Sequence, residues 1–256
     1  MLDTLGRAWR VVATGFCFAV FGLGGLFIRC VVYPLLVLLV RREDWRETLV
    51  KGFMHYTLGW FVELMRCTGV LTYEVRNVER LHRRGLLILA NHPSLIDIVF
   101  LISLVHHVDC IVKASLANNP FTRGPVRAAR FITNNGGAKL LDDCLASLDR
   151  GNNLIVFPEG TRTPLHGRVK LHRGAANVAV RGSRDITPVH IASSLPMLPK
   201  GVPWWQVPRR RPHFIIDVRE DIAIAPFRER AAGDPMAARL VTDYLDEHLF
   251  KEPSHA

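Results

Sequence analysis

The chain has 256 residues, and its 33 Lys and Arg residues against 23 Asp and Glu give a net charge of +10 and a pI near 9.9. This balance favours anionic partners such as a membrane surface or an acidic carrier protein, and the lack of an RNP-like or helix-turn-helix signature argues against nucleic acid. The five scattered cysteines have no CxxC spacing, which argues against a disulfide framework or a zinc site and for a reducing compartment.

The first 44 residues raise the question of a membrane. Residues 11–28 carry no charge, and after Arg29 the segment 30–40 is again uncharged. Since a span needs about 20 apolar residues, one tilted span or two short halves meeting at residues 22–25 would fit, with a buried core helix pair as the alternative. Arginines flank both sides, which disfavours placing either end outside. We predict a re-entrant or monotopic helical hairpin on the cytoplasmic face of the inner or plasma membrane.

The next segment, residues 45–69, places aromatic and apolar side chains near helical spacing. This pattern predicts a helix that either lies at a membrane interface or packs on the following domain. Gly69 is a suitable helix end, and residues 71–75 then alternate like a half-buried edge strand.

Downstream, predicted strands alternate with predicted helices. The further strands are residues 86–90, 110–112, 154–157, 186–191 and 214–218. The helices are residues 94–105, 137–150, 174–181 and 234–250. Such alternation predicts an α/β fold with a mixed sheet flanked by helices.

A polar stretch, Asn-His-Pro-Ser-Leu-Ile-Asp, directly follows the strand at residues 86–90. Pro93 suits the first turn of a helix, where its missing N–H would have no partner. The Asp97 carboxylate can then reach one nitrogen of His92, which fixes the tautomer and leaves the other nitrogen as a general base. The pair predicts proton abstraction. The alternative is a structural histidine and a solvated helical aspartate.

A second polar stretch, Phe-Pro-Glu-Gly-Thr-Arg, follows the strand at residues 154–156. Gly160 permits a tight turn, Arg162 offers a forked cation for phosphate or carboxylate, and Glu159 can orient that fork. Glu159 and Arg162 would both lie at strand ends, where α/β folds bind ligands. A structural salt bridge between them is the alternative.

A His-x4-Asp motif followed by FPEGTR resembles the glycerolipid acyltransferases, the 1-acylglycerol-3-phosphate O-acyltransferase (lysophospholipid acyltransferase) family. The resemblance covers residues 86–191 and includes Lys113 with the Pro and Gly that follow it, and residues 170–176. The chain departs from the family pattern at Asn134, where an arginine is usual in the block that shapes the acceptor site.

The resemblance implies an O-acyltransferase in which His92, oriented by Asp97, deprotonates an acceptor hydroxyl that attacks an acyl thioester directly. It implies acyl-CoA or acyl-carrier protein as the donor, with no cofactor and no metal. The turn at Gly160 is a candidate for donating an N–H to the oxyanion. The residues implied to bind substrate are Glu159, Gly160, Thr161, Arg162 and Lys113. For Lys113 the alternative is a cation that only contacts solvent.

The implied acceptor is a lysophospholipid. The first hypothesis is that this acceptor is 1-acyl-sn-glycerol-3-phosphate and that the product is phosphatidic acid. Asn134 favours the alternative of a phosphate-free lipid, an amino-acid lipid or a secondary metabolite. A membrane-bound lipid-binding scaffold with a degenerate site is the third possibility. On this interpretation residues 1–69 are membrane-associated helices on an anionic leaflet, and residues 70–256 form the acyltransferase catalytic domain.

One further stretch, residues 203–211, pairs two indoles with three arginines. Indoles favour the lipid headgroup layer, and each arginine near an anionic surface contributes on the order of 1 kcal/mol. The stretch predicts a membrane contact beside the site where the acyl chain enters. A solvated loop between strands is the alternative.

Overall fold

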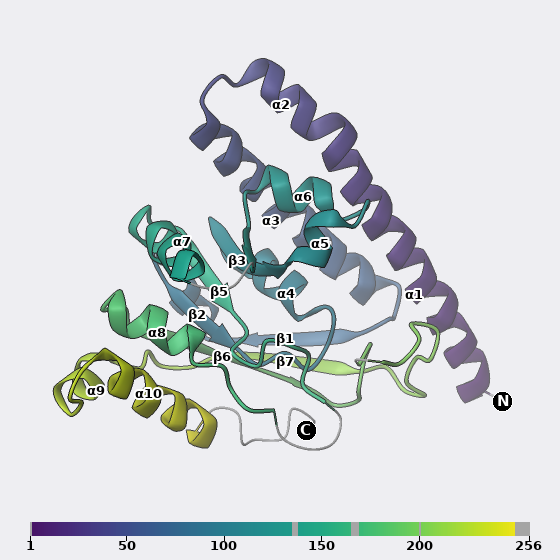
Figure 1. Cartoon of the computed structure of the whole chain (residues 1–256). Helices are drawn as coiled ribbons and strands as arrows, with labels where there is room; N and C mark the ends of the chain where they lie inside the picture. Colours follow the sequence, from purple (N-terminus) through teal and green to yellow (C-terminus); the bar gives the residue numbers. More distant parts are fainter. Residues whose placement is uncertain (1, 135–137, 165–168, 200, 249–256) are drawn as a thin grey trace.

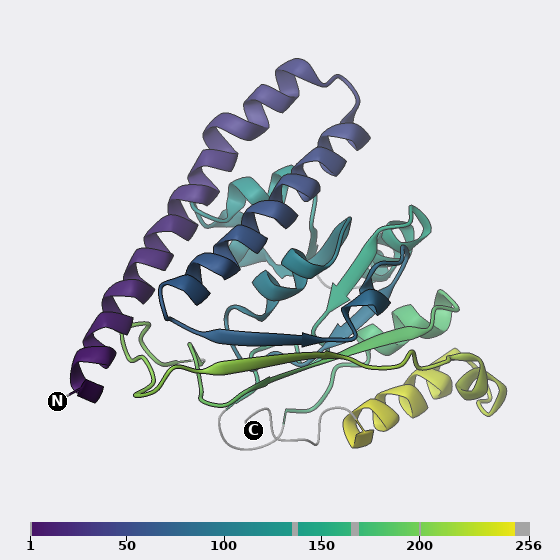
Figure 2. The same cartoon turned by 180° about the vertical axis from the view of Figure 1, so that it is seen from behind.

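The computed structural model describes residues 2–134, 138–164, 169–199 and 201–248, and Figure 1 labels its elements. A long helical run opens the chain and comprises α1 (Leu2–Phe27), a π-helical segment (Ile28–Val32) and α2 (Tyr33–Leu39). The next helix, α3 (Glu43–Cys67), turns back along this run, as Figures 1 and 2 show from opposite sides.

Strands and helices alternate after α3. The strands are β1 (Thr72–Arg76), β2 (Leu87–Ala90), β3 (Val108–Lys113), β4 (Ile132–Asn134), β5 (Asn153–Val156), β6 (Ile186–Ser193) and β7 (His213–Val218). The α-helices are α4 (Asp97–Leu104), α5 (Ala114–Asn118), α6 (Arg123–Ala128), α7 (Ala138–Asp149), α8 (Gly174–Arg181), α9 (Ala225–Glu229) and α10 (Asp234–His248), and a 3-10 helix spans Val78–Leu81.

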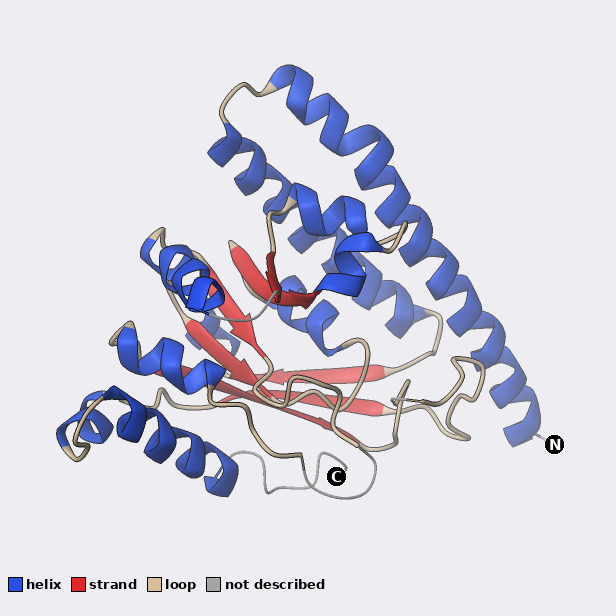
Figure 3. Cartoon of the chain, in the orientation of Figure 1, coloured by secondary structure: helices blue, strands red, loops and turns tan. Residues whose placement is uncertain are grey.

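The strands form one sheet in the order β1-β7-β6-β2-β5-β3-β4, drawn in red in Figure 3. Every neighbouring pair is parallel except β6 and β7, which are antiparallel. The sheet is therefore mixed, as predicted, and β1 is one of its edges, as the alternation in residues 71–75 indicated.

Two apolar clusters cover the two faces of the sheet. Alternate residues of β2 face opposite clusters, because side chains along a strand point to opposite sides. Ile88 and Ala90 join the cluster that contains residues of α3 and α4, whereas Leu87 and Leu89 join the cluster that contains residues of α7, α8 and α10. The predicted α/β fold with helices on both faces is confirmed.

The short elements are the ones that the sequence did not predict. Strand β4 has three residues, and helices α5, α6 and α9 have five or six. A hydrophobic period needs more residues than these to become visible. Each predicted strand and helix is present with ends shifted by a few residues, except that residues 137, 249 and 250 of the predicted helices lie outside the described residues.

The predicted break at residues 22–25 is wrong, because α1 continues through them. A Cβ on Gly25 would lie 2.2 Å from the Phe121 carbonyl oxygen, so this glycine allows close approach of the loop before α6. The hairpin instead turns at residues 40–42, between α2 and α3. The run Thr4–Leu39 is long and apolar enough to cross a membrane by length and composition. In its apolar stretch of 18 residues, 22% is buried.

A buried ion pair joins the hairpin to the sheet. Lys51 of α3 is 4% exposed, and its Nζ lies 2.6 Å from Asp109 Oδ1 in β3 and 2.6 Å from Glu47 Oε1. The other Asp109 oxygen accepts hydrogen bonds from Ser147 Oγ of α7 (2.5 Å) and Asn152 Nδ2 (3.0 Å). This network crosslinks α3, β3 and α7, and breaking a buried pair is costly because one charge stays behind without its partner.

We expect Lys51→Ala to lower the free energy of unfolding by about 3–5 kcal/mol, because it leaves the Asp109 carboxylate buried without its cation. Urea unfolding in one fixed detergent measures the change. The control is Arg66→Ala on the same helix, whose pair with Glu63 is exposed, so a loss below about 1 kcal/mol is expected. Equal losses in the two variants would contradict a role for the buried network.

Candidate active site

The two polar motifs leave the sheet at the same edge. In the parallel pairing of β2 with β5, Leu89 lies opposite Val156. The segments that follow, beginning at Asn91 and Phe157, therefore emerge side by side at the carboxyl ends of these strands. Strand β3 ends at this edge too, with Lys113 as its last residue. Ligands of open α/β sheets bind in this position.

The Asp97 carboxylate organises the turn between β2 and α4. It is fully buried, and its oxygens accept hydrogen bonds from the Ser94 backbone N–H (2.6 Å), Ser94 Oγ (2.5 Å) and His92 Nδ1 (2.9 Å). Ser94 Oγ in turn accepts from the Ile96 N–H at 3.2 Å. Helix α4 therefore begins at Asp97 itself, and the predicted start at residue 94 is too early because these contacts hold residues 94–96 in a turn.

His92 has no hydrogen-bond partner at Nε2 among the residues that the structure describes. Its side chain is 18% exposed, and its ring stacks on Phe157 with centroids 4.2 Å apart and planes 19° from parallel. Burial raises the pKa of Asp97, and the hydrogen bonds from His92 and Ser94 oppose that rise. With Asp97 ionised, Nδ1 carries the proton and Nε2 is left as the base. The predicted contact between His92 and Asp97 is present.

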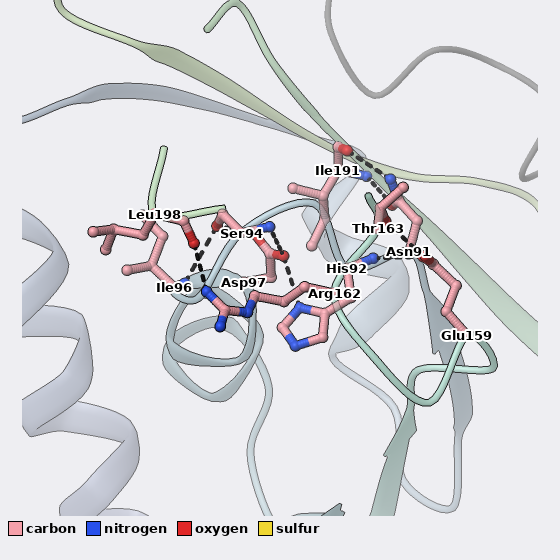
Figure 4. Close-up of polar contacts among 10 residues, drawn as sticks. All are labelled: Asn91, His92, Ser94, Ile96, Asp97, Glu159, Arg162, Thr163, Ile191 and Leu198. Carbon is pink, nitrogen blue, oxygen red and sulfur yellow. Dashed lines mark hydrogen bonds and ion pairs between the residues drawn. The ribbon is translucent and has the colours of Figure 1, made fainter. Parts of the chain in front are cut away.

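The second motif holds the backbone of His92 from both sides. The His92 N–H donates to Glu159 Oε1 at 2.9 Å, and the His92 carbonyl accepts from the Thr163 N–H at 2.7 Å. Thr163 Oγ1 closes the arrangement by donating to the same Glu159 oxygen at 2.9 Å. Figure 4 shows these residues beside the imidazole. Thr163 was not predicted from the sequence, since its main contact is made by the backbone and leaves no mark on residue type.

Asn91 anchors the start of the turn to the neighbouring strand. Its side-chain Nδ2 donates to the Ile191 carbonyl at 2.8 Å, and its Oδ1 accepts from the Ile191 N–H at 2.7 Å. The amide thus acts as a backbone-like partner for β6 one residue beyond the end of β2 (Figure 4). This partner lies 100 residues away in the chain and was not predicted from the sequence.

The predicted pairing of Glu159 with Arg162 is wrong. Glu159 is 3% exposed and points to the backbone of His92, as described above. Arg162 Nη1 instead donates to the Leu198 carbonyl at 2.7 Å, and its side chain lies beside the His92 ring in Figure 4. Among the described residues, Nε and Nη2 have no hydrogen-bond partner, so Arg162 can still offer two N–H donors to an anion.

The turn at Gly160 has a left-handed backbone with φ of +62°. Its N–H donates to the Phe157 carbonyl at 3.0 Å, so this group of the turn is already engaged, and an oxyanion contact from the turn stays a prediction. A Cβ at Gly160 would lie 2.8 Å from His172 Cδ2, which shows that the His172 ring covers the turn.

The remaining predicted residues lie around this centre. Thr161 is partly exposed within the second motif, and Lys113 is exposed at the end of β3. Strand β5 lies between β2 and β3, so Lys113 is two strands from β2 at the same edge. Asn134 pairs with Lys113 in register at the end of β4 and is also exposed. These residues lie toward the same edge of the sheet as His92.

Part of the chain is similar to known acyltransferases. Residues 72–192 match the protein family described as Acyltransferase. A 1-acyl-sn-glycerol-3-phosphate acyltransferase of Pseudomonas aeruginosa is 27% identical over 135 residues, which cover 49% of this chain and 51% of that protein. A lyso-ornithine lipid O-acyltransferase of the same organism is 33% identical over 128 residues, covering 46% of this chain and 49% of that protein. The chain thus spans about half the length of these curated relatives.

A solved structure extends the similarity to the whole fold. The crystal structure of the 1-acyl-sn-glycerophosphate (LPA) acyltransferase PlsC from Thermotoga maritima aligns with a TM-score of 0.68 and 19% sequence identity. The alignment covers 96% of this chain and 97% of that one. At this identity the likeness concerns the fold, including the N-terminal helices.

The buried Glu159 predicts a pH-dependent stability difference. Burial raises the pKa of its carboxyl above the ordinary value of a glutamate, so the ionised form costs free energy in the folded state. Glu159→Gln keeps Oε1 as an acceptor and removes that charge. We expect the variant to match the wild type near pH 4, where the carboxyl is protonated, and to gain stability over it as the pH rises through the folded pKa.

Urea unfolding of both proteins between pH 4 and pH 8 measures this difference. Glu229→Gln is the control, because Glu229 is exposed on α9 and its substitution reports only the general effect of one lost charge. A stability difference between Glu159→Gln and the wild type that stays constant across this range would contradict the assignment.

Proposed function

We propose that this chain, whose residues 72–192 match the Acyltransferase family, transfers a fatty acyl group from an acyl thioester to the hydroxyl of a lysophospholipid. The observation that supports the chemistry best is the 2.9 Å contact between His92 Nδ1 and the buried Asp97. Hydrogen bonds at both the N–H and the carbonyl of His92 also fix its backbone. A lipid-binding scaffold would have no need of a base prepared in this way.

The reaction needs one base and no covalent intermediate. His92 Nε2 takes the proton from the acceptor hydroxyl as its oxygen forms a bond to the thioester carbonyl carbon. Collapse of the tetrahedral adduct breaks the C–S bond, and the leaving thiolate takes the proton from His92. Ser94 is no rival nucleophile because its hydroxyl is buried and donates to Asp97. Burial also raises the pKa of Cys144 to about 12, so that thiol stays protonated.

For the acceptor we propose 1-acyl-sn-glycerol-3-phosphate, which would give phosphatidic acid. Two observations favour it: the relative of that name, and the two N–H donors that Arg162 retains beside His92. A forked guanidinium suits a phosphate group. Lys113, exposed at the same edge, is a further cation for an anionic part of either substrate.

A second acceptor class has its own support. The lyso-ornithine lipid O-acyltransferase has the higher identity of the two Pseudomonas relatives, 33% over 128 residues against 27% over 135. Asn134 stands in this chain where the family usually has an arginine, which removes one cation from the acceptor side. An amino-acid lipid carries a different headgroup and would make fewer demands on such a cation. We therefore keep an amino-acid lysolipid as the alternative acceptor.

The donor and the location complete the proposal. Acyl-CoA and acyl-carrier protein are both acidic partners that suit a chain of net charge +10. We propose that the N-terminal helices lie on the cytoplasmic face of a membrane. The exposed apolar side chains of α1 and α2 support this, since a soluble domain seldom leaves so large an apolar surface open.

The test is acyl transfer by detergent-purified protein with acyl-CoA or acyl-carrier protein as donor, and with lysophosphatidic acid, lyso-ornithine lipid and phosphate-free lysolipids as acceptors. Removal of a general base typically costs about 10²–10⁴ in rate, so His92→Ala is expected to lose that much turnover. His248→Ala is the matched control, because His248 is exposed on the distant helix α10.

The acceptor panel separates the two candidates. Transfer to lysophosphatidic acid that is lost in His92→Ala supports the first, and transfer to lyso-ornithine lipid alone supports the second. Transfer that survives in His92→Ala at the wild-type rate would contradict the assignment of His92 as the base.

A further inference from the structure

The stretch of residues 203–211 is fastened to the N-terminal half of α1. Figures 1 and 2 both place the loop before β7 against this part of the helix. Arg10 of α1 donates from Nη2 to the Pro208 carbonyl at 3.3 Å and also to the Arg209 carbonyl. The Trp204 ring packs on Phe18 with centroids 5.8 Å apart, and a Cβ on Gly15 would lie 3.1 Å from it. The loop and the helix therefore present a single surface.

The arginines of this surface divide into two groups. Arg10 is engaged with the loop backbone, and Arg211 donates to the carbonyls of Leu71 (2.9 Å) and Arg66, so both serve the fold. The guanidinium groups of Arg209 and Arg210 are different, because both side chains are exposed and have no hydrogen-bond or ion-pair partner among the described residues. Arg7, one helical turn before Arg10 on α1, is exposed in the same way.

The nearby acidic side chains do not neutralise these three cations. Glu63, near the end of α3, pairs with Arg66 at 2.7 Å, and Glu74 of β1 pairs with Arg76 at 2.7 Å. Among the side chains that the structure describes, these three guanidinium groups at one end of α1 therefore have no acidic partner. An uncompensated cluster of this kind attracts an anionic partner.

An uncharged apolar stripe runs from this end along the outer side of α1. Its members recur at helical spacing and are between 52% and 70% exposed: Leu5, Trp9, Val12, Phe16, Leu23 and Phe27. Trp205, 54% exposed, stands at right angles to Trp204 beside the same helix. Nucleic acid and acidic proteins would leave these apolar side chains in water, whereas a bilayer accepts both the stripe and the indole.

We propose that Arg7, Trp205, Arg209 and Arg210 form a binding site for the headgroups of an anionic phospholipid bilayer. The indole lies at the headgroup layer and the arginines pair with lipid phosphates, while the stripe on α1 contacts the acyl region. Because the loop is fastened to α1, this site orients the helix hairpin on the membrane. The inference rests on the membrane association proposed above and not on the chemistry at His92.

The test is partitioning of the full-length protein onto sedimenting vesicles of phosphatidylcholine alone or with one third phosphatidylglycerol. Each arginine near an anionic surface contributes about fivefold, so Arg209→Ala/Arg210→Ala is expected to bind the anionic vesicles about 30-fold more weakly. Binding of the same variant to phosphatidylcholine vesicles is expected to change less than threefold, since only the electrostatic part is lost.

The matched control is Arg150→Ala/Arg181→Ala, which removes the same charge from the ends of α7 and α8, away from α1. It is expected to keep wild-type binding. Equal weakening in the two double variants, or none in either, would overturn the site, as would a wild-type protein without preference for anionic vesicles. Acyl transfer to detergent-dispersed substrate separates this proposal from the proposed function, because the arginine variant is expected to keep the wild-type rate there.

Discussion

Two hydrogen bonds to the backbone of His92 hold the site together. Its N–H and carbonyl are taken by Glu159 and Thr163, which belong to the loop after β5, whereas His92 itself follows β2. The two motifs, 67 residues apart between His92 and Glu159, therefore act as one unit. The stacking of Phe157 on the imidazole adds a third contact from the same loop. The direction of the free ring nitrogen depends on both loops at once, which is the preorganisation that catalysis requires.

Holding this unit in place costs stability that the rest of the chain offsets. Burial raises the pKa of both Asp97 and Glu159, so each ionised carboxylate is disfavoured by folding. Helix α4, which begins at Asp97, packs along α3, and His55 Nδ1 of α3 meets the carbonyls of Ile102 (3.0 Å) and Val105 (3.1 Å) at its other end. The hairpin that we propose for the membrane thus also supports the helix that carries Asp97.

The sequence was most informative where residue type and local spacing carry the signal. The five-residue spacing of His92 and Asp97 after a strand predicted their contact, and apolar runs predicted the long strands. It was least informative where the backbone makes the contact, as at Thr163. It also did not predict the direction of a side chain, since Arg162 contacts Leu198 whereas the nearby Glu159 contacts His92. The glycine-rich segment at residues 22–25 was predicted to be the point where two helical halves meet. In the structure the helix continues, and Gly25 allows the backbone at Phe121 to approach α1 closely.

The most direct test of this account is the protonation of the two ring nitrogens of His92. Nitrogen NMR of the detergent-solubilised protein, labelled at histidine and assigned by comparison with His92→Ala, reports it in the resting state. For the neutral ring the account predicts the proton on Nδ1 and a bare Nε2, because the Asp97 carboxylate accepts from Nδ1. A ring that carries its single proton on Nε2 would contradict His92 as the base.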